Sequence, residues 1–308
     1  NMKLLFLDAY RKSHARISKD TAGGYGTENS LGDGFFGNLM SRIIKHSIFW
    51  PNLSFIQLME EFKSIDNECY YRKQVGSNIK PNENWDAIFV CSSIVCFETE
   101  IETCNQIKNN YNVPIFLCGS IAQFIKEKIP EGVTLITGNY EFLVQRLDIT
   151  NESLKELNNK KVINVVNGKP EKLKNIDWSR SSLKGNKNFL LGNKKFFLPF
   201  ITTRGCPYSC FEYCTYPLAQ GNKILQEPVE NVIEKLKEIS NKFPNAHIVF
   251  RDPVFSINMK HTKMLLKKIG DAKLNIDFSA ELHLKNVDDE FIELCVYAKF
   301  TGLKFGIE

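Results

Sequence analysis

Short apolar segments alternate with helical segments along most of this 308-residue chain, and that alternation limits the folds open to it. In the first half we predict strands at residues 3–8, 68–72, 85–91, 113–118 and 133–137, and helices at residues 52–63, 97–110, 121–128 and 140–146. Strands that alternate with helices form parallel sheets whose faces are covered by those helices. The pattern therefore predicts the α/β class, beginning with a doubly wound, Rossmann- or flavodoxin-like parallel sheet.

The second half repeats the alternation with four predicted strands and three predicted helices. The strands are 198–203, 247–252, 275–281 and 302–307, and the helices are 228–243, 260–269 and 288–299. A repeated strand-then-helix unit is typical of a (β/α) barrel. Because the sequence ends as the fourth strand ends, we predict a partial TIM-like barrel that is truncated after that strand. Its open edge would mean either that the chain is a fragment or that something else covers the edge.

These two halves give the expected domain organisation. We assign residues 2–148 to the first sheet, residues 149–197 to a connector and residues 198–308 to the partial barrel. The connector is rich in Asn and Lys and has weak periodicity, so we expect no more in it than a β-hairpin around residues 162–166.

Composition excludes several classes of protein. Apolar residues make up 43% of the chain, which is enough for a core, and 40 Lys and Arg against 35 Asp and Glu give only a mildly basic charge. The basic residues are scattered, so a nucleic-acid partner is not indicated. There is no signal peptide, and no apolar run approaches the ~18 residues of a membrane span. Nine cysteines in so large a chain favour reduced thiols, and we expect the protein in the cytoplasm.

Three cysteines occupy one short loop after a predicted strand, namely Cys206, Cys210 and Cys214. Three thiolates on one loop can bind three irons of a cubane cluster and leave the fourth iron open for chemistry. A structural zinc site or unrelated free thiols are the alternatives, but zinc normally takes four ligands and no fourth Cys or His lies nearby. The other six cysteines are isolated and are expected to pack as small hydrophobic residues, namely Cys69, Cys91, Cys96, Cys104, Cys118 and Cys295.

The surroundings of this loop resemble the core of radical S-adenosylmethionine (SAM) enzymes over residues 198–308. The phrase that carries the resemblance is Thr203-Arg204-Gly205-Cys206-Pro207-Tyr208-Ser209-Cys210. Residues 2–147 resemble the cobalamin-binding-type domain that precedes this core in one subclass. That domain has a Gly-Gly turn and a Gly-Glu-x-Glu turn, and the corresponding turns here are Cys118-Gly119-Ser120 and Gly138-Asn139-Tyr140-Glu141.

The sequence departs from the family pattern in three ways. The family spaces its cysteines as Cys-x3-Cys-x2-Cys, whereas here the second gap also holds three residues. The first domain lacks the Asp-x-His-x-x-Gly motif that supplies a histidine ligand to cobalt. The family's barrel has six strands, and only four are predicted here.

The resemblance implies that Cys206, Cys210 and Cys214 hold a 4Fe–4S cluster whose open iron binds SAM. One electron from the cluster would cleave SAM to methionine and a 5′-deoxyadenosyl radical.

The resemblance also implies contacts with SAM from Tyr213 and from the ends of predicted strands. Tyr213 would lie against the adenine, and the strand-end residues are Asp252, Glu281 beside His283, and Glu308. Taken alone, Asp252 is explained as well by a capping or turn role, and Glu281 by a solvated strand end.

For the first domain the resemblance implies a cobalamin site made of small residues that follow predicted strands. These residues, which would let a corrin approach the backbone, are Ser92, Ser93, Gly119, Ser120 and Gly138. Small residues also suit tight turns between a strand and a helix, and this explanation is equally open.

The leading hypothesis is therefore a radical SAM enzyme that transfers a methyl group to an unactivated carbon with cobalamin. One alternative is a radical SAM enzyme without cobalamin that catalyses a rearrangement, an oxidation or a sulfur insertion. Another is a truncated, cluster-carrying partner subunit without activity of its own. The expected partners are a small-molecule or peptide substrate and a reductant such as flavodoxin or ferredoxin. The sequence does not identify the substrate.

Overall fold

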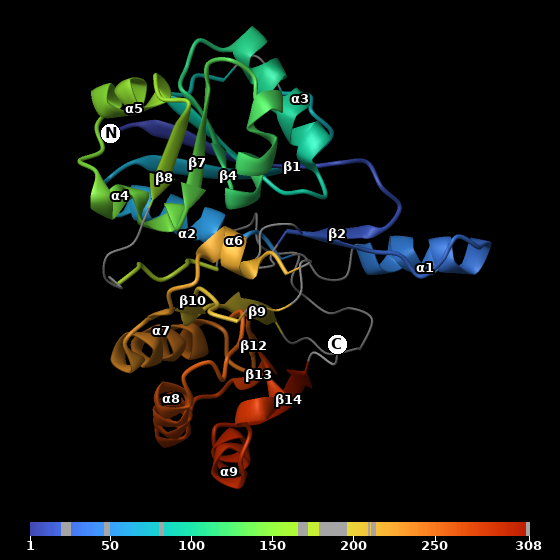
Figure 1. Ribbon diagram of the computed structural model, residues 1–308, viewed down its shortest axis with the longest axis vertical. Coiled ribbons are helices and arrows are strands. Elements are labelled where there is room, and N and C mark those ends of the chain that lie inside the picture. Colours follow the sequence, from blue (N-terminus) through green and yellow to red (C-terminus); the bar gives the residue numbers. More distant parts are fainter. Residues whose placement is uncertain are drawn as a thin grey trace.

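Two parallel sheets, each with its own helices, make up the computed structural model (Figure 1). The structure describes residues 1–19, 26–45, 50–79, 83–165, 172–178, 196–208, 210 and 214–305. We call the six-stranded sheet with its helices, coloured blue to green in Figure 1, the first unit. The four-stranded sheet with its helices, coloured yellow to red, is the second unit. The predicted α/β class is confirmed.

The sheet of the first unit is parallel throughout. Its strands are β1 (Lys3–Tyr10), β4 (Glu68–Val75), β5 (Ala87–Cys91), β6 (Ile115–Cys118), β7 (Val133–Gly138) and β8 (Val162–Val165), in the order β4-β1-β5-β6-β7-β8. The chain adds β4 on one side of β1 and every later strand on the other side. The order therefore reverses between β1 and β5, and such sheets bind ligands at the carboxyl ends of the strands beside the reversal. We call this edge of the sheet the carboxyl edge.

Alternating side chains let the central strands bury both faces of this sheet. Along β1, Leu4 and Phe6 belong to the apolar cluster on one face, whereas Leu5 and Leu7 belong to the cluster on the other. The first face is covered by α2 (Leu53–Lys63), α4 (Leu143–Arg146) and α5 (Asn151–Asn158), and the second by α3 (Phe97–Asn110). Every residue of β5 is buried, as expected for a central parallel strand.

Three elements of the first unit differ from the prediction. The helix predicted at 121–128 is a 3₁₀ helix, η1 (Ser120–Lys128). The polar helix α5 was not predicted, although Thr150 and Ser153 form a capping box at its start. The strand β8 falls in the predicted connector, and within the described ranges its partner is β7, with which it pairs in parallel. The prediction for 140–146 is confirmed by η2 (Tyr140–Phe142) and α4.

The sheet of the second unit is also parallel, and its strands lie side by side in the order in which the chain makes them. They are β9 (Phe197–Phe200), β12 (His247–Phe250), β13 (Asp277–Leu282) and β14 (Phe300–Phe305). The helices α7 (Val229–Lys242), α8 (Met259–Asp271) and α9 (Asp289–Tyr297) lie together on one side of this sheet (Figure 1). A short 3₁₀ helix, η4 (Leu284–Asn286), precedes α9. The core contains three stacked rings, Phe250, Phe278 and Phe300, whose centroids are 5.4–5.8 Å apart.

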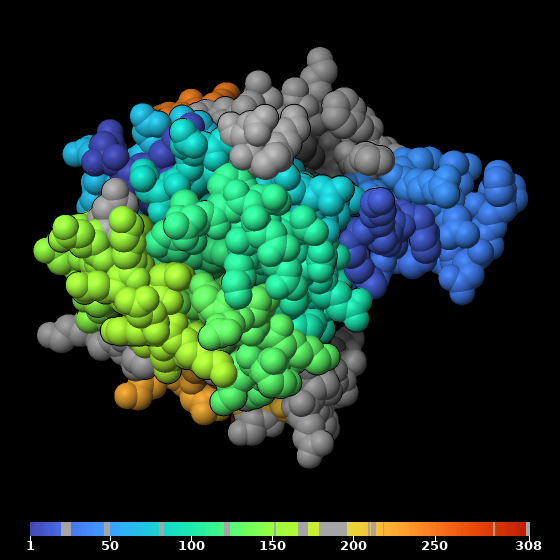
Figure 2. Space-filling model, turned by 90° about the horizontal axis from the view of Figure 1, so that it is seen from above, coloured from blue at the N-terminus to red at the C-terminus, as the bar shows by residue number. Residues whose placement is uncertain are grey.

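A small arm projects from the first unit. The strands β2 (Arg16–Ser18) and β3 (Thr27–Asn29) pair antiparallel, and α1 (Phe35–Lys45) follows them. Figures 1 and 2 both show α1 standing off the side of the molecule, where Phe35 and Phe36 are 78% and 77% exposed. Within the described part of the chain, no helix combines the length and apolarity that crossing a bilayer requires.

Candidate active site

The cysteine loop, residues 206–214, is held at its base by backbone hydrogen bonds. The strand β10 (Thr203–Arg204) runs into the loop and pairs antiparallel with β11 (Leu225–Gln226). Beyond this pairing, the N–H of Cys206 donates to the carbonyl of Gly221 at 3.1 Å. Gly221 follows the short helix α6 (Tyr216–Gln220), which comes directly after the loop. The position of the first cysteine is thus fixed by the two segments that enclose the loop.

Gly205 allows the chain to enter the loop between these segments. Its φ is +80°, which favours glycine, and its N–H donates to the side-chain carbonyl of Gln220 at 3.0 Å. A Cβ on Gly205 would lie only 2.0 Å from the carbonyl oxygen of Lys223. Any other residue would have to push the two segments at the base of the loop apart.

All three cysteines of the loop line one cavity of about 430 Å³, although Cys206 is buried, Cys214 half-buried and Cys210 exposed. The other walls of the cavity come from the loop, from α6 and from the carboxyl ends of β12, β13 and β14. These wall residues are Tyr208, Thr215, Tyr216, Pro253, Val254, Glu281, Leu282, His283, Lys304 and Phe305. The cavity is in the size range of small-molecule sites. It lies where parallel β/α folds place their ligands.

The pKa of the Cys206 thiol depends on its burial and on its neighbours in the loop. Burial raises the pKa of the Cys206 thiol, a backbone hydrogen bond at Tyr208 opposes the rise, and Cys210 and Cys214 add to it. No three His, Cys, Asp or Glu side chains among the described residues already form a site for a single metal ion. In a cubane cluster each thiolate binds a different iron, so the sulfur atoms need not converge on one point. A donor set of three thiols in one cavity therefore fits such a cluster in its chemistry.

Asp252 lies at the end of β12 but does not line the cavity. Its carboxylate is buried and accepts hydrogen bonds from both the N–H and the hydroxyl of Thr202, the first at 2.6 Å. Burial raises the pKa of Asp252 to about 6, although the hydrogen bonds from Thr202 act in the opposite direction. The residue at this strand end that does line the cavity is the next one, Pro253.

Glu281 does line the cavity, at the end of β13. Its carboxylate is partly exposed and accepts a hydrogen bond from Nη1 of Arg251 at 2.7 Å. The guanidinium of Arg251 also lies 5.6 Å from the ring of Trp50 in the first unit. The remaining two residues predicted to contact SAM, Tyr213 and Glu308, lie outside the described residues.

His283 lies on the same wall as Glu281 and packs against Tyr208 of the cysteine loop. Its ring centroid is 5.4 Å from that of Tyr208. The N–H of Lys285 donates to Nδ1 of His283 at 3.2 Å, so a neutral imidazole carries its proton on Nε2. The sequence prediction missed Tyr208 and Lys304 as cavity residues. Tyr208 could have been included because it stands between two of the cysteines.

At the carboxyl edge of the first sheet, four of the residues predicted for cobalamin, Ser92, Ser93, Gly119 and Gly138, are packed against their neighbours. Ser93 donates from both its N–H and its hydroxyl to Glu100, each at 2.8 Å. A Cβ on Gly119 would lie 2.9 Å from Cβ of Ser92, and one on Gly138 would lie 2.4 Å from the carbonyl oxygen of Val165. The backbone of Ser120 begins η1 at the same edge. Close packing between neighbouring turns thus explains why Gly119 and Gly138 lack side chains.

A buried charge network, not predicted from the sequence, lies beside the strand reversal of the first sheet. The ammonium of Lys19 is 2.9 Å from Asp8 and 2.6 Å from Glu100, and all three side chains are fully buried. Tyr10 and Tyr71 donate their hydroxyls to Asp8 at 2.9 and 2.7 Å. The ammonium lies between the two carboxylates and attracts both, so this network is a structural feature of the carboxyl edge.

The cysteine loop lies next to the carboxyl edge of the first sheet. The helix α6, which follows the loop, packs against η1 and β7, and Figure 1 shows it between the two units. On the other side of the loop, Arg204 forms a buried ion pair with Glu141 of η2. The predicted cluster site and the predicted cobalamin site are therefore neighbours in space.

No family model and no curated protein matches this sequence. Solved structures do match it. The chain is similar to the radical S-adenosylmethionine methyltransferase TsrM from Kitasatospora setae with cobalamin and a 4Fe–4S cluster bound, at 13% identity and a TM-score of 0.67 over 100% of this chain. It is similar to TsrM with tryptophan substrate and the SAM analogue aza-SAM bound, at 13% identity and a TM-score of 0.66 over 99% of this chain.

A further similar structure is apo OxsB, a cobalamin-dependent S-adenosylmethionine radical enzyme, at 15% identity and a TM-score of 0.54 over 100% of this chain. This chain spans 59% of the length of TsrM and 44% of that of OxsB. At such identities the likeness shows a shared fold. The resemblance stated from the sequence is thus confirmed at the level of the fold.

Proposed function

We propose that this chain is the SAM- and cobalamin-binding part of a radical SAM enzyme, with methyl transfer to an unactivated carbon as the leading reaction. The observation that carries the proposal is that Cys206, Cys210 and Cys214 line one cavity at the carboxyl ends of β12, β13 and β14. The fold supports it, because TsrM and OxsB share that fold. We also propose that the four-stranded sheet is part of a (β/α) barrel and that the domains run 2–148 and 198–308, joined by residues 149–197, of which α5 and β8 pack onto the first sheet.

In this proposal the three thiolates hold a 4Fe–4S cluster, and the open iron binds SAM. When bound, the cluster supplies the electron that cleaves SAM to methionine and a 5′-deoxyadenosyl radical. Glu281 and His283, which line the cavity, would bind polar groups of SAM. Asp252 would act indirectly, by holding Thr202 and with it the strand that enters the loop.

Two further SAM contacts are carried over from the sequence. Tyr213 is proposed to lie against the adenine, and Glu308 to reach SAM from the end of the β14 region. For cobalamin, the proposed contacts are the small residues of the carboxyl edge, Ser92, Ser93, Gly119, Ser120 and Gly138. Their position beside α6 would place a corrin between the first unit and the cysteine loop.

A reductant and a substrate complete the proposed system. The reductant would be a one-electron donor such as flavodoxin or ferredoxin, and the substrate a small molecule or peptide. All nine cysteines are free thiols. This suits a reducing compartment such as the cytoplasm, where the cluster could also be assembled.

The test is anaerobic reconstitution of the purified chain with iron and sulfide, followed by reduction in the presence of SAM. We expect a bound 4Fe–4S cluster and the release of 5′-deoxyadenosine. Replacing Cys206, Cys210 and Cys214 together by Ala should abolish both, whereas Cys69→Ala should abolish neither. A chain that binds iron and sulfide but releases no 5′-deoxyadenosine would favour the partner-subunit alternative.

A radical SAM enzyme without cobalamin is the second candidate, and the burial of the carboxyl edge favours it. Ser92 and Ser93 are only 3% and 1% exposed, and both donors of Ser93 are already bound to Glu100. A corrin would have to displace these contacts. Purification after incubation with hydroxocobalamin separates the candidates, because corrin absorption that stays with the protein supports the first and its absence supports the second.

A further inference from the structure

Arg204 connects the cysteine loop to the first unit through a buried ion pair. Arg204 ends β10 and is followed directly by Gly205 and Cys206. Its Nε donates to Oε1 of Glu141, a residue of η2 that is 63 positions away in sequence. The two side chains are only 9% and 2% exposed. Arg204, two residues before Cys206, is therefore anchored at the carboxyl edge of the first sheet.

The burial of this ion pair makes each partner depend on the other. A buried charge that loses its partner is strongly destabilising, because neither water nor another group compensates it. The guanidinium of Arg204 also lies 5.8 Å from the centroid of the Phe142 ring, so it has an aromatic face on one side. A displacement of η2 would consequently act on Arg204 and through it on Cys206.

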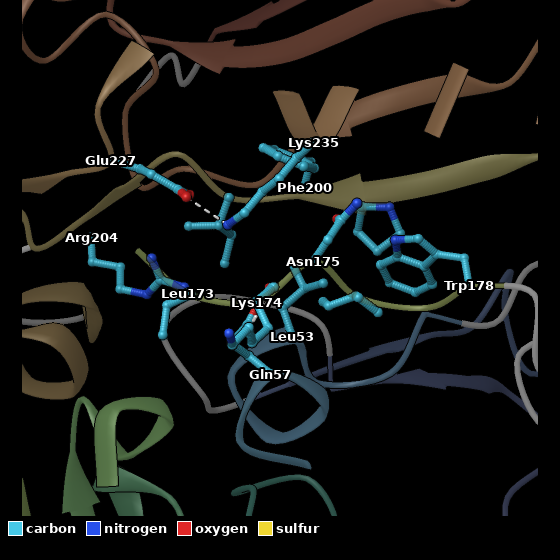
Figure 3. Close-up of a pocket in the computed structure, with 13 residues that line it drawn as sticks. Leu53, Gln57, Leu173, Lys174, Asn175, Trp178, Phe200, Arg204, Glu227 and Lys235 are labelled. Carbon is cyan, nitrogen blue, oxygen red and sulfur yellow. Dashed lines mark hydrogen bonds and ion pairs between the residues drawn. The ribbon is translucent and has the colours of Figure 1, made fainter. Parts of the chain in front are cut away.

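A second buried ion pair lies next to Arg204. It occupies the nearby carboxylate Glu227, and Arg204 pairs with Glu141. Lys235 lies 2.6 Å from Glu227, and both line the same pocket of about 30 Å³ as Arg204 (Figure 3). Burial lowers the pKa of Lys235, and the carboxylate of Glu227 opposes this effect. The positive charge of Arg204 lowers the pKa of Lys235 further, by a smaller amount. Figure 3 shows Glu227 directed to Lys235, with Arg204 set apart from that pair. Among the described residues, the junction thus holds two separate buried cation–carboxylate pairs, and Arg204 with Glu141 is the one that reaches the cysteine loop.

The other end of the loop rests on the same edge of the first sheet. The helix α6, which begins two residues after Cys214, packs against η1 and β7. Glu141 follows β7 in the chain, so both anchors of the loop converge on the end of that strand. The hydrogen bond from Cys206 to Gly221 closes the loop between its two anchors.

We propose that Arg204 is a positioning residue for the cysteine loop. Because Arg204 is held by Glu141, the arrangement of the three thiols depends on the structure of the carboxyl edge of the first sheet. The inference rests on the proposed function for the role of the thiols. Occupancy of the carboxyl edge and the geometry of the cluster site are then coupled, and such coupling is reciprocal.

The first test is hydrogen exchange on the chain without cofactors. Glu141→Gln removes the charge at nearly constant volume, and amides of residues 203–206 should then exchange at least about tenfold faster. Glu234→Gln is the matched control, because it breaks an exposed ion pair, with Lys172, at the same junction. It should leave exchange at residues 203–206 unchanged.

A double variant tests whether Glu141 and Arg204 act as a pair. If they do, Glu141→Gln with Arg204→Gln should exchange no faster than Arg204→Gln alone, because the second change removes an interaction already lost. Additive effects of the two changes would contradict the pairing. Glu141→Asp keeps the charge and should restore most of the protection, which a general weakening of the junction would not explain.

The second test is the electron paramagnetic resonance spectrum of the reduced, reconstituted cluster. Glu141→Gln should change this spectrum and weaken its response to SAM, although the variant keeps all three cysteines. An unchanged spectrum together with unchanged exchange would overturn the inference. If the wild-type chain assembles no cluster, the proposed function fails, and the exchange measurements alone still decide whether Arg204 positions the loop.

Discussion

The carboxylate of Asp252 accepts the backbone N–H of Thr202 at 2.6 Å and also the hydroxyl of the same residue. This contact joins the end of β12 to the segment between β9 and β10, which leads into the cysteine loop. The carboxyl is fully buried, and burial raises its pKa from 3.8 to about 6. Asp252 therefore titrates within a pH range in which the folded protein can be studied.

Asp252→Asn should remove a pH dependence of stability. The folded chain binds the proton of Asp252 more tightly than the unfolded chain does, so this group stabilises the fold most below 3.8 and loses that contribution as pH rises through about 6. Between about pH 4 and about pH 7 the wild type should lose on the order of 2 kcal/mol relative to the variant. Urea unfolding at several pH values measures this, with exposed Asp33→Asn as the control. A difference between wild type and variant that does not change with pH would contradict the assignment.

Gly205→Ala should disrupt the cysteine loop far more than its φ angle alone explains. Gly132 is the matched control, since its φ of +83° resembles the +80° of Gly205 but no atom lies within 4 Å of a Cβ placed there. Gly132→Ala should cost about 1–2 kcal/mol, the ordinary penalty for the left-handed region. Gly205→Ala should cost more than about 4 kcal/mol, because its Cβ meets the carbonyl of Lys223.

The measurements for this pair are urea unfolding and the iron content after reconstitution. Gly205→Ala should retain little iron, whereas Gly132→Ala should retain the wild-type amount. Equal effects of the two substitutions would mean that the contact with Lys223 is easily relieved and that Gly205 does not set the shape of the loop.

The alternation of strands and helices could be read from the sequence because burial on both faces leaves a continuous apolar pattern. The helix α3, predicted at 97–110, has those bounds in the structure, and β1 begins at the predicted residue Lys3. The helix α5 was missed because its sequence is polar. The extended segment at β8 was expected, but its parallel pairing with β7 was not, because pairing between distant strands leaves no local pattern. Residues 120–128 kept their helical periodicity but form a 3₁₀ helix, a distinction that periodicity does not make.

Of the candidate site, the sequence could predict only what lies within one motif or at one strand end. The convergence of Cys206, Cys210 and Cys214 on one cavity is such a local feature. The pairing of Arg204 with Glu141 joins residues far apart in the chain, so no local pattern could indicate it. For Asp252 the sequence left a contact with SAM and a capping or turn role open, and it could not indicate that the N–H and hydroxyl of Thr202 donate to this carboxylate.

Lys19→Met should strongly destabilise the first unit. Burial alone would lower the pKa of Lys19, but the attraction of Asp8 and Glu100 outweighs it and carries the pKa well above its ordinary value. Removing the ammonium leaves two buried carboxylates without compensation, at a cost of about 3–5 kcal/mol. Lys268→Met, which breaks an exposed pair with Glu230, should change the free energy of unfolding by less than about 0.5 kcal/mol.

A triple variant decides whether charge or shape explains that loss. Lys19→Met combined with Asp8→Asn and Glu100→Gln removes the cation and both carboxylates together. It should recover much of the stability lost in Lys19→Met, because no uncompensated charge remains. If the triple variant is no more stable than Lys19→Met, the lysine acts through the packing of its side chain.

The three loop cysteines should differ in their reactivity before a cluster is assembled and become alike afterwards. Cys210 is exposed, Cys214 is half-buried and Cys206 is buried, and burial raises the pKa of the Cys206 thiol. Because thiolates react with iodoacetamide, the expected order of alkylation in the chain without iron is Cys210, then Cys214, then Cys206. Buried Cys104, whose pKa is also raised by burial, should remain unmodified throughout.

Mass spectrometry of peptides after timed alkylation gives this order directly. Reconstitution with iron and sulfide should protect all three loop cysteines together, because each thiolate then binds an iron. Cys69, a half-buried thiol outside the loop, should keep its rate and so reports any general change in the fold. Protection of only one or two of the loop cysteines would mean that an unprotected thiol is not a cluster ligand. Because the second gap of Cys-x3-Cys-x3-Cys is one residue longer than in the family, Cys214 is the cysteine for which this test matters most.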